Sequence, residues 1–273
     1  MNRIKLFLAG EGGQGIQTIA KVLVDAAELQ GYQVTYIPAF GVEQRGTPST
    51  AYIIIDNKPI LYPRFESADI AVILQERALS LVKKHVTPKS KVIFDSSTVP
   101  AKLIEHANKL GIPATQIAAT QFIAKSFNIL IIGKLSQLLN LDENLVWDSI
   151  TKVLGKKFKD EKVKKLNLDT FKFGRSAIFE VDHFSKPVFM PMKEKIVRKG
   201  FGKHALILPE RCKGCHICIA KCPVAALSKG DNLGVFATAV PEIDLEKCIA
   251  CGNCFRFCPD AAIKVEKDKS AKE

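Results

Sequence analysis

A chain of 273 residues, 47% hydrophobic and 25% charged, has the composition of a soluble globular protein and is long enough for two domains. No apolar run approaches the roughly 18 residues of a membrane-spanning helix, and Leu6–Ala9 is too short for a secretion signal, so we expect a cytoplasmic protein. Residues 150–203 hold 15 Lys or Arg against 6 Asp or Glu, which concentrates the net charge of +12 there. Without a nucleic-acid motif beside it, this excess favours a solvated helix face or an acidic protein partner over nucleic acid.

Strand and helix patterns alternate along the first half of the chain. Short β-branched runs predict strands, and apolar residues that recur every three or four positions predict helices. The predicted strands are 3–9, 33–38, 51–56, 69–74, 91–95 and 112–118. The predicted helices are 16–31, 76–85, 100–111, 121–140, 143–155 and 160–178. We therefore expect a Rossmann-like, doubly wound α/β domain with a mostly parallel sheet over residues 1–182.

The stretch GEGGQGIQT joins the first strand to the first helix. A glycine turn between a strand and a helix is typical of phosphate binding, because the helix N-terminus attracts anions. The candidate cofactor-binding residues are Gly10, Gly12, Gly13 and Gly15. A dinucleotide fingerprint would need an acidic residue at the end of the second strand, and an ATPase loop would need a lysine. Both are missing, so a purely structural glycine turn remains the third alternative.

A basic, proline-containing segment over residues 183–203 is interpreted as an extended linker, and a second domain is expected over residues 204–273. All eight cysteines of the chain lie in this last part, within an internal repeat. Residues 210–227 and 246–263 align at an offset of 36, and each carries Cys-x2-Cys-x2-Cys-x3-Cys-Pro. A charged tail follows.

This cysteine spacing predicts two [4Fe–4S] clusters in a small α+β domain of the bacterial ferredoxin type, in which the fourth cysteine of each run ligates the other cluster. One cluster is assigned to Cys212, Cys215, Cys218 and Cys258. The other is assigned to Cys248, Cys251, Cys254 and Cys222. Zinc is the alternative, but structural zinc sites favour separated Cys-x2-Cys pairs. His216 lies inside the first motif, where the ligand count is already complete.

Together these motifs resemble those of the 2-oxoacid:ferredoxin oxidoreductases, which include the pyruvate and 2-ketoisovalerate enzymes. GEGGQGI, the loop over residues 40–49 and the strand over residues 51–56 are similar to the gamma subunit. The cysteine-rich part is similar to the delta subunit, a two-cluster ferredoxin. The chain thus resembles a gamma subunit fused to a delta subunit over nearly its whole length.

The resemblance implies an oxidoreductase subunit within a hetero-oligomeric complex. Its alpha and beta partners would bind thiamine diphosphate, Mg²⁺ and the 2-oxoacid, and the acyl group would pass to coenzyme A. The clusters of this chain would relay electrons from the oxidative decarboxylation to external ferredoxin. Coenzyme A is a candidate ligand of the glycine turn and of Arg45, although Arg45 is equally suited to an ion pair with Glu43 or to a subunit contact.

The competing hypothesis is a self-contained nucleotide-binding iron–sulfur module with a redox or regulatory role. It requires nucleotide affinity in the isolated chain, and it needs no partner subunits. The missing lysine and the missing ribose-binding acid argue against it.

Overall fold

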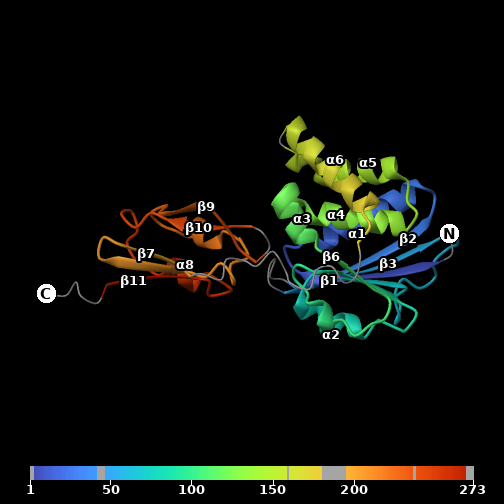
Figure 1. The fold of residues 1–273 in the computed structure, drawn as a ribbon, viewed down its shortest axis with the longest axis horizontal. Coiled ribbons are helices and arrows are strands. Elements are labelled where there is room, and N and C mark those ends of the chain that lie inside the picture. The colour runs from blue at the N-terminus through green and yellow to red at the C-terminus, as the bar shows by residue number, and fades with distance from the viewer. Residues whose placement is uncertain (1–2, 42–46, 159, 180–194, 236–237, 269–273) are drawn as a thin grey trace. The chain divides into compact units, whose positions relative to one another are not determined.

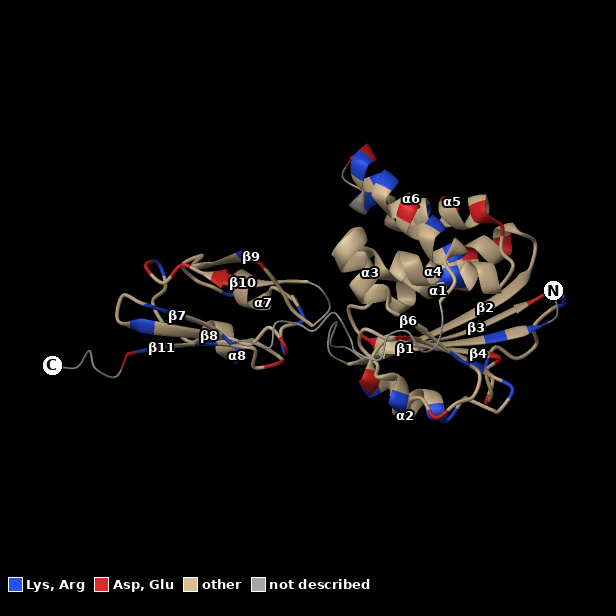
Figure 2. Cartoon of the chain, viewed as in Figure 1, with Lys and Arg blue, Asp and Glu red and all other residues tan. Residues whose placement is uncertain are grey.

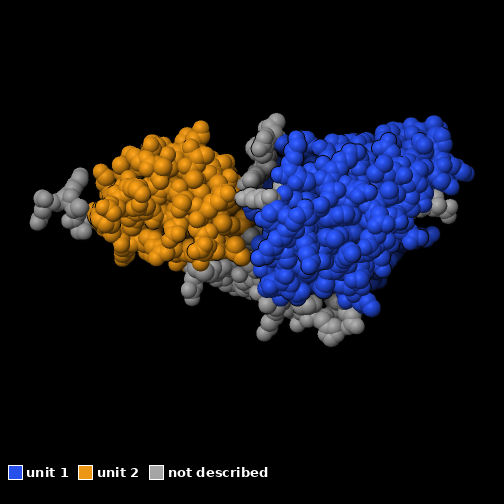
Figure 3. All heavy atoms as spheres, turned by 90° about the horizontal axis from the view of Figure 1, so that it is seen from above, with its two compact units in different colours: residues 1–188 blue, residues 189–273 orange. Residues whose placement is uncertain are grey.

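The structure is a computed structural model that describes residues 3–41, 47–158, 160–179, 195–235 and 238–268 (Figure 1). The chain divides into two compact units, residues 1–188 and 189–273 (Figure 3). None of the helices in the described ranges combines the length and the hydropathy of a membrane-spanning segment.

The first unit is built on a six-stranded sheet with the order β2-β3-β1-β4-β5-β6. Four neighbouring strands pair in parallel: β1 (Ile4–Glu11), β4 (Ile70–Ile73), β5 (Lys91–Asp95) and β6 (Lys109–Ile112). β3 (Pro48–Asp56) runs antiparallel to both β1 and β2 (Gln33–Phe40). β3 is thus the one reversed strand of this sheet, and the predicted mostly parallel α/β fold is confirmed.

The two faces of the sheet belong to two hydrophobic cores. In β1, Leu6 and Leu8 contribute to one core, whereas Phe7 and Ala9 contribute to the other. Alternate residues of a strand point to opposite faces, so the buried middle of this strand needs apolar residues at consecutive positions. Helices cover both faces, and α2 lies on the opposite side of the sheet from α1 and α4 (Figure 1).

The larger core is covered by helices α1 (Ile16–Leu29), α3 (Ala114–Gln121), α4 (Phe127–Leu138), α5 (Glu143–Leu154) and α6 (Glu161–Ser176). The smaller core is covered by α2 (Leu79–Lys83). The short 3-10 turns are η1 (Glu76–Ala78), η2 (Ala101–Leu103), η3 (Ala124–Ser126) and η4 (Gly155–Lys157). The predicted end of the first helix near Gly31 is correct, because Gly31 adopts the left-handed conformation directly after it.

Two predicted elements between the fifth strand and α4 are wrong. Residues 100–111 were expected to be a helix, but they contain only η2 and most of β6. Residues 112–118 were expected to be a strand, but α3 begins at Ala114. Pro113 separates β6 from α3, since proline lacks the N–H of a sheet ladder yet fits the start of a helix. The predicted helix over 121–140 is likewise interrupted by η3 before α4 begins.

Asp95 joins the carboxyl end of β5 to the start of α3. Its carboxylate is fully buried and accepts hydrogen bonds from the Thr115 N–H (3.1 Å), the Thr115 hydroxyl (2.5 Å) and the Ser97 N–H (3.0 Å). Burial raises the pKa of Asp95, and the hydrogen bonds from Thr115 and Ser97 partly oppose this rise. The side chain therefore caps α3 and holds it against the sheet.

We expect Asp95→Asn to lower the free energy of unfolding by about 2–4 kcal/mol, because an amide NH₂ would face buried N–H donors and leave them unsatisfied. Urea titration of the full chain, followed by the fluorescence of its single tryptophan, Trp147, measures this loss. Asp148→Asn on the exposed face of α5 is the control, with a change within about 0.5 kcal/mol. Equal stability of both variants would exclude the capping role.

Helices α4 and α6 approach each other through two glycines. A Cβ atom added to Gly174 would lie 2.2 Å from the Leu130 carbonyl oxygen, and one added to Gly133 would lie 2.3 Å from that of Phe171. The opposite face of α6 is basic, with Lys162, Lys164, Lys165 and Lys172 exposed (Figure 2). This part of the basic segment thus fits the interpretation of a solvated helix face.

The second unit contains a three-stranded sheet of order β11-β8-β7 and a two-stranded sheet of β10 and β9. The strands are β7 (Ile196–Gly200), β8 (Lys203–Ile207), β9 (Leu227–Leu233), β10 (Ala239–Ile243) and β11 (Ile263–Lys267). The expected linker over 183–203 is therefore too long at its end, because β7 pairs antiparallel with β8 and belongs to this unit. Its first part, residues 183–194, lies outside the described residues.

Candidate metal centre

The internal repeat of the sequence recurs in the backbone of the second unit. Each half contains one short helix, α7 (Ile217–Ala220) or α8 (Asn253–Arg256), directly inside its cysteine motif. Left-handed residues occur in pairs at the offset of 36: Gly214 and Ala250, His216 and Gly252, Ala225 and Ala261. These bends fold the chain tightly enough for three closely spaced cysteines to face one centre.

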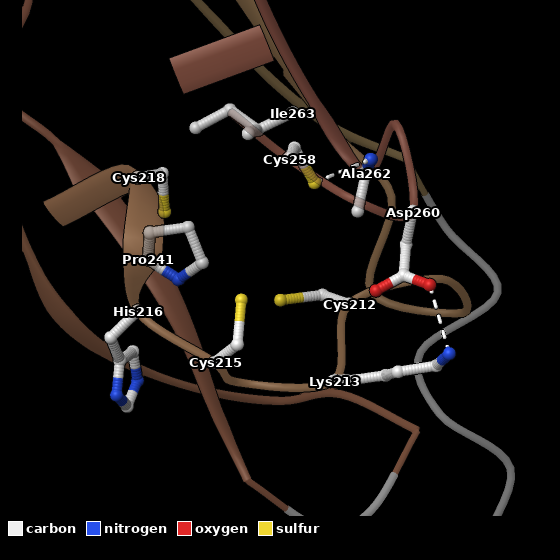
Figure 4. A pocket seen from close by; sticks show the side chains of 10 residues that line it. All are labelled: Cys212, Lys213, Cys215, His216, Cys218, Pro241, Cys258, Asp260, Ala262 and Ile263. Carbon is white, nitrogen blue, oxygen red and sulfur yellow. Dashed lines mark hydrogen bonds and ion pairs between the residues drawn. The ribbon is translucent and has the colours of Figure 1, made fainter. Parts of the chain in front are cut away.

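One cavity is lined by Cys212, Cys215, Cys218 and Cys258. Figure 4 shows the four sulfur atoms directed into the same space, with Cys258 arriving from the second motif. These are the four cysteines that the sequence assigns to one cluster.

A second cavity is lined by Cys248, Cys251, Cys254 and Cys222. Its other lining residues are uncharged, and most are apolar, among them Leu227, Ile243 and Val265. The eight cysteines thus divide into two sets of four, and each set takes three members from one motif and one from the other.

The donor set fits two iron–sulfur clusters. Backbone N–H groups donate to the sulfur atoms of Cys222 (3.3 Å, from Ala226) and Cys258 (3.2 Å, from Ala262), at equivalent positions of the repeat. Such hydrogen bonds stabilise thiolate sulfur and influence the reduction potential of a cluster. In the described residues no compact group of three or more His, Cys, Asp or Glu is arranged to hold a single metal ion.

Burial favours the protonated thiol at three of the cysteines. It raises the pKa of Cys212 to about 11 and that of Cys218 to about 12, and the neighbouring cysteines add to both shifts. Burial also raises the pKa of Cys254. Because iron binds thiolates, cluster assembly has to displace these protons.

Charged and polar side chains surround the first set of cysteines. Lys213 is buried and forms an ion pair with Asp260 (2.9 Å) at the edge of the cavity (Figure 4). The His216 ring contacts the carbonyl oxygen of Ala239 through Nε2 (3.0 Å), so this histidine lies beside the cysteines without completing their ligand set.

Two exposed alanines of the repeat, Ala225 and Ala261, adopt left-handed conformations (φ 49° and 47°) that glycine tolerates better. We expect Ala261→Gly to stabilise the cluster-loaded chain by about 0.5–1 kcal/mol, since relief of the strain exceeds the added entropy of the unfolded chain. Urea-induced loss of the visible cluster absorbance measures the change. Ala220→Gly in α7 is the control and should destabilise by about 1 kcal/mol. A loss in both variants would refute strain at position 261.

The glycine turn occupies the carboxyl end of β1 and the start of α1, where the sequence placed it. Gly13 and Gly15 are left-handed (φ 103° and 81°), as the turn requires. The Gly12 N–H donates to the Thr47 carbonyl (2.9 Å), and the Gln14 side chain donates to the Leu74 carbonyl (2.7 Å). These bonds attach the turn to the start of β3 and to the end of β4.

An acidic side chain lies within this turn. Glu11 is buried, and its carboxylate lies 3.5 Å from the Arg77 guanidinium. A buried carboxylate beside the turn opposes the binding of a phosphate there. A Cβ atom on Gly10 would lie 2.6 Å from the Gln14 side-chain oxygen, which gives this glycine a packing role. Arg45 lies outside the described residues, and the cofactor role of the turn stays a prediction.

Sequence reasoning missed the lysines beside the cysteines. Lys203, the first residue of β8, donates to the carbonyl oxygens of Leu245 (2.9 Å) and Cys248 (2.5 Å). The repeat alignment places Ala239 opposite Lys203, so the difference between the halves is visible in the sequence. The contact itself is not, because it joins positions 45 residues apart.

Comparison with known proteins covers both units. Residues 5–177 match the family described as pyruvate ferredoxin/flavodoxin oxidoreductase, and residues 204–259 match a 4Fe-4S dicluster domain. The 2-oxoglutarate synthase subunit KorC of Archaeoglobus fulgidus is 31% identical over 190 residues, which cover 68% of this chain and 97% of that protein. The pyruvate/ketoisovalerate oxidoreductases common subunit gamma of Pyrococcus furiosus is 30% identical over 182 residues, which cover 56% of this chain and 90% of that subunit.

Solved structures share the fold. The gamma subunit of a keto/oxoacid ferredoxin oxidoreductase from Geobacter sulfurreducens has a TM-score of 0.53 at 18% identity, covering 64% of this chain and 95% of that one. The 2-oxoglutarate:ferredoxin oxidoreductase of Magnetococcus marinus, solved with 2-oxoglutarate, coenzyme A and succinyl-CoA, has a TM-score of 0.58 at 23% identity. The match covers 64% of this chain but only 31% of that longer protein.

Proposed function

Because the chain belongs to the pyruvate ferredoxin/flavodoxin oxidoreductase family and carries a 4Fe-4S dicluster domain, we propose that it is the electron-transferring gamma–delta subunit of a 2-oxoacid:ferredoxin oxidoreductase. The observation that carries the proposal is the grouping of eight cysteines into two sets of four on the same chain as the family's α/β unit. Bound [4Fe–4S] clusters supply one-electron transfer at low potential.

The cysteines would hold the clusters, and their surroundings would set the conditions of transfer. Cys212, Cys215, Cys218 and Cys258 would hold one cluster; Cys248, Cys251, Cys254 and Cys222 would hold the other. Because each cluster would take ligands from both motifs, it would join the two halves of the second unit, which has few other core residues. Apolar residues such as Ile243 and Val265 line the second set and lower the local dielectric.

Decarboxylation of the 2-oxoacid would take place on partner subunits. In this proposal, alpha and beta subunits bind thiamine diphosphate and Mg²⁺, and the chain passes electrons from them to an external ferredoxin in the cytoplasm. The names of the relatives, which include 2-oxoglutarate and pyruvate/ketoisovalerate enzymes, support a 2-oxoacid as the substrate class. Coenzyme A would be the acyl acceptor, as the ligands named for the Magnetococcus marinus enzyme suggest.

Anaerobic purification of the tagged chain from its native cell, with mass spectrometry of the bound proteins, tests this function. We expect two further chains that carry thiamine diphosphate, and bleaching of the cluster absorbance when a 2-oxoacid and coenzyme A are added. Recovery of the chain alone, loaded with iron and able to bind a nucleotide, would instead support the self-contained redox or regulatory module.

A further inference from the structure

In the two halves of the second unit, the carbonyl oxygen of the first cysteine of each motif accepts a hydrogen bond from a different kind of donor. In the first half, the carbonyl oxygen of Cys212 accepts a hydrogen bond from the backbone N–H of Val235 (2.9 Å). In the second half, the carbonyl oxygen of Cys248 accepts one from the Lys203 ammonium (2.5 Å). A neutral amide thus occupies the position in one half that a positive charge occupies in the other.

The internal repeat allows equivalent positions of the two halves to be compared directly. Cys212 and Cys248 are equivalent at the offset of 36, and β8 and β10 are equivalent strands whose first residues are Lys203 and Ala239. Lys203 is fixed by the pairing of β8 with both β7 and β11. Its ammonium also donates to the Leu245 carbonyl (2.9 Å), so it spans the turn that leads into the second motif.

The charges beside the two sets of cysteines are balanced differently. Lys213, beside the first set, forms an ion pair with Asp260 (2.9 Å), which cancels most of its field. Lys203 donates to two carbonyl oxygens, and no acidic side chain among the described residues lies within ion-pair distance of it. Among the described residues, the ammonium at the Cys248 carbonyl therefore has no acidic counter-charge, and the neighbouring cavity has an uncharged lining that does little to screen it.

We propose that Lys203 is a positioning residue for the cluster of Cys222, Cys248, Cys251 and Cys254, and that its charge raises the reduction potential of that cluster alone. This inference rests on the proposed cluster binding. Reduction adds one negative charge to a cluster, and a nearby fixed cation stabilises the more negative state. Through the Cys248 carbonyl, the same ammonium also holds the backbone that presents the cysteine sulfur.

Redox titration of the full chain, followed by electron paramagnetic resonance of the reduced clusters, tests the proposal. Lys203→Met removes the charge but keeps the length of the side chain, and Lys203→Arg keeps the charge. Lys267→Met is the matched control, because Lys267 is exposed and lies opposite Lys203 in the register of β8 and β11. Iron content is measured for every variant.

In Lys203→Met, we expect the ratio of reduced to oxidised cluster at a fixed potential to fall about tenfold for one couple, which is about 59 mV for one electron. The affected couple should be the one that Cys222→Ser removes. Lys203→Arg and Lys267→Met should keep both potentials. If Lys203→Met loses one cluster, the result for Lys203→Arg decides. Two clusters at wild-type potentials in Lys203→Arg support the inference, and loss of the same cluster in that variant overturns it.

Three further results would overturn the inference: unchanged potentials in a fully loaded Lys203→Met chain, equal shifts of both couples, or an equal shift in Lys267→Met. A wild-type chain that binds no iron–sulfur cluster would instead refute the proposed function. The two failures are thus distinguishable by iron content.

Discussion

Serine at position 258 should destroy the cluster of Cys212, Cys215 and Cys218, although Cys258 belongs to the other motif. The four sulfur atoms line one cavity, and a hydroxyl is a poor substitute for a thiolate ligand of iron (Figure 4). We expect Cys258→Ser to retain about half of the iron and to lose one of two signals in electron paramagnetic resonance.

The variant at the equivalent cysteine of the other motif is the control. Cys222 lies in the first motif, but Cys222→Ser should remove the cluster of Cys248, Cys251 and Cys254. The two variants should therefore lose different signals, and Cys212→Ser should reproduce the loss seen in Cys258→Ser. If Cys222→Ser and Cys212→Ser eliminate the same signal, the crossed assignment is wrong.

Alanine at position 174 should separate α4 from α6. Its methyl group would lie 2.2 Å from the Leu130 carbonyl oxygen, and this backbone atom cannot move without displacing α4. Overpacking costs about 1–3 kcal/mol and occasionally more, and a clash with a backbone atom of the facing helix belongs at the upper end of that range, whereas the gain in helix propensity is about 1 kcal/mol. We expect Gly174→Ala to lower the free energy of unfolding by at least about 2 kcal/mol.

Trp147 reports this change locally, since its ring stacks on Phe171 with centroids 6.1 Å apart, one turn before Gly174. Urea titration by tryptophan fluorescence gives the free energy. Gly155→Ala is the matched control: Gly155 is helical in its backbone angles and has no atom within 4 Å of the added Cβ. That variant should be stabilised by about 0.4–1 kcal/mol. A stable Gly174→Ala chain would show that the two helices can separate freely.

The sequence predicted best the features with a strong local pattern. β1, β3, β4 and β5 are apolar runs between turn residues, and α1 has a regular apolar stripe, so each was predicted at nearly its observed place. The cysteine spacing is specific enough to propose two sets of four before any coordinates. In the structure, the two cavities contain these same sets.

The failures occurred where contacts between distant residues decide the structure. The segment over residues 100–121 has short apolar runs that fit either period, and α3 begins where Asp95, from another element, caps it. β7 resembles a basic linker in sequence, and its pairing with β8 makes it a strand. The contact between Lys203 and Cys248 is of the same kind, since neither residue alone indicates it.

The central claim is that this chain receives electrons from oxidation of a 2-oxoacid on partner subunits. Freeze-quench electron paramagnetic resonance of the anaerobically purified complex, mixed with a 2-oxoacid and coenzyme A, tests it most directly. The claim predicts that both cluster signals of this chain appear on reduction and that Cys222→Ser removes one of them. Clusters that stay oxidised in a complex that still consumes the 2-oxoacid would contradict it.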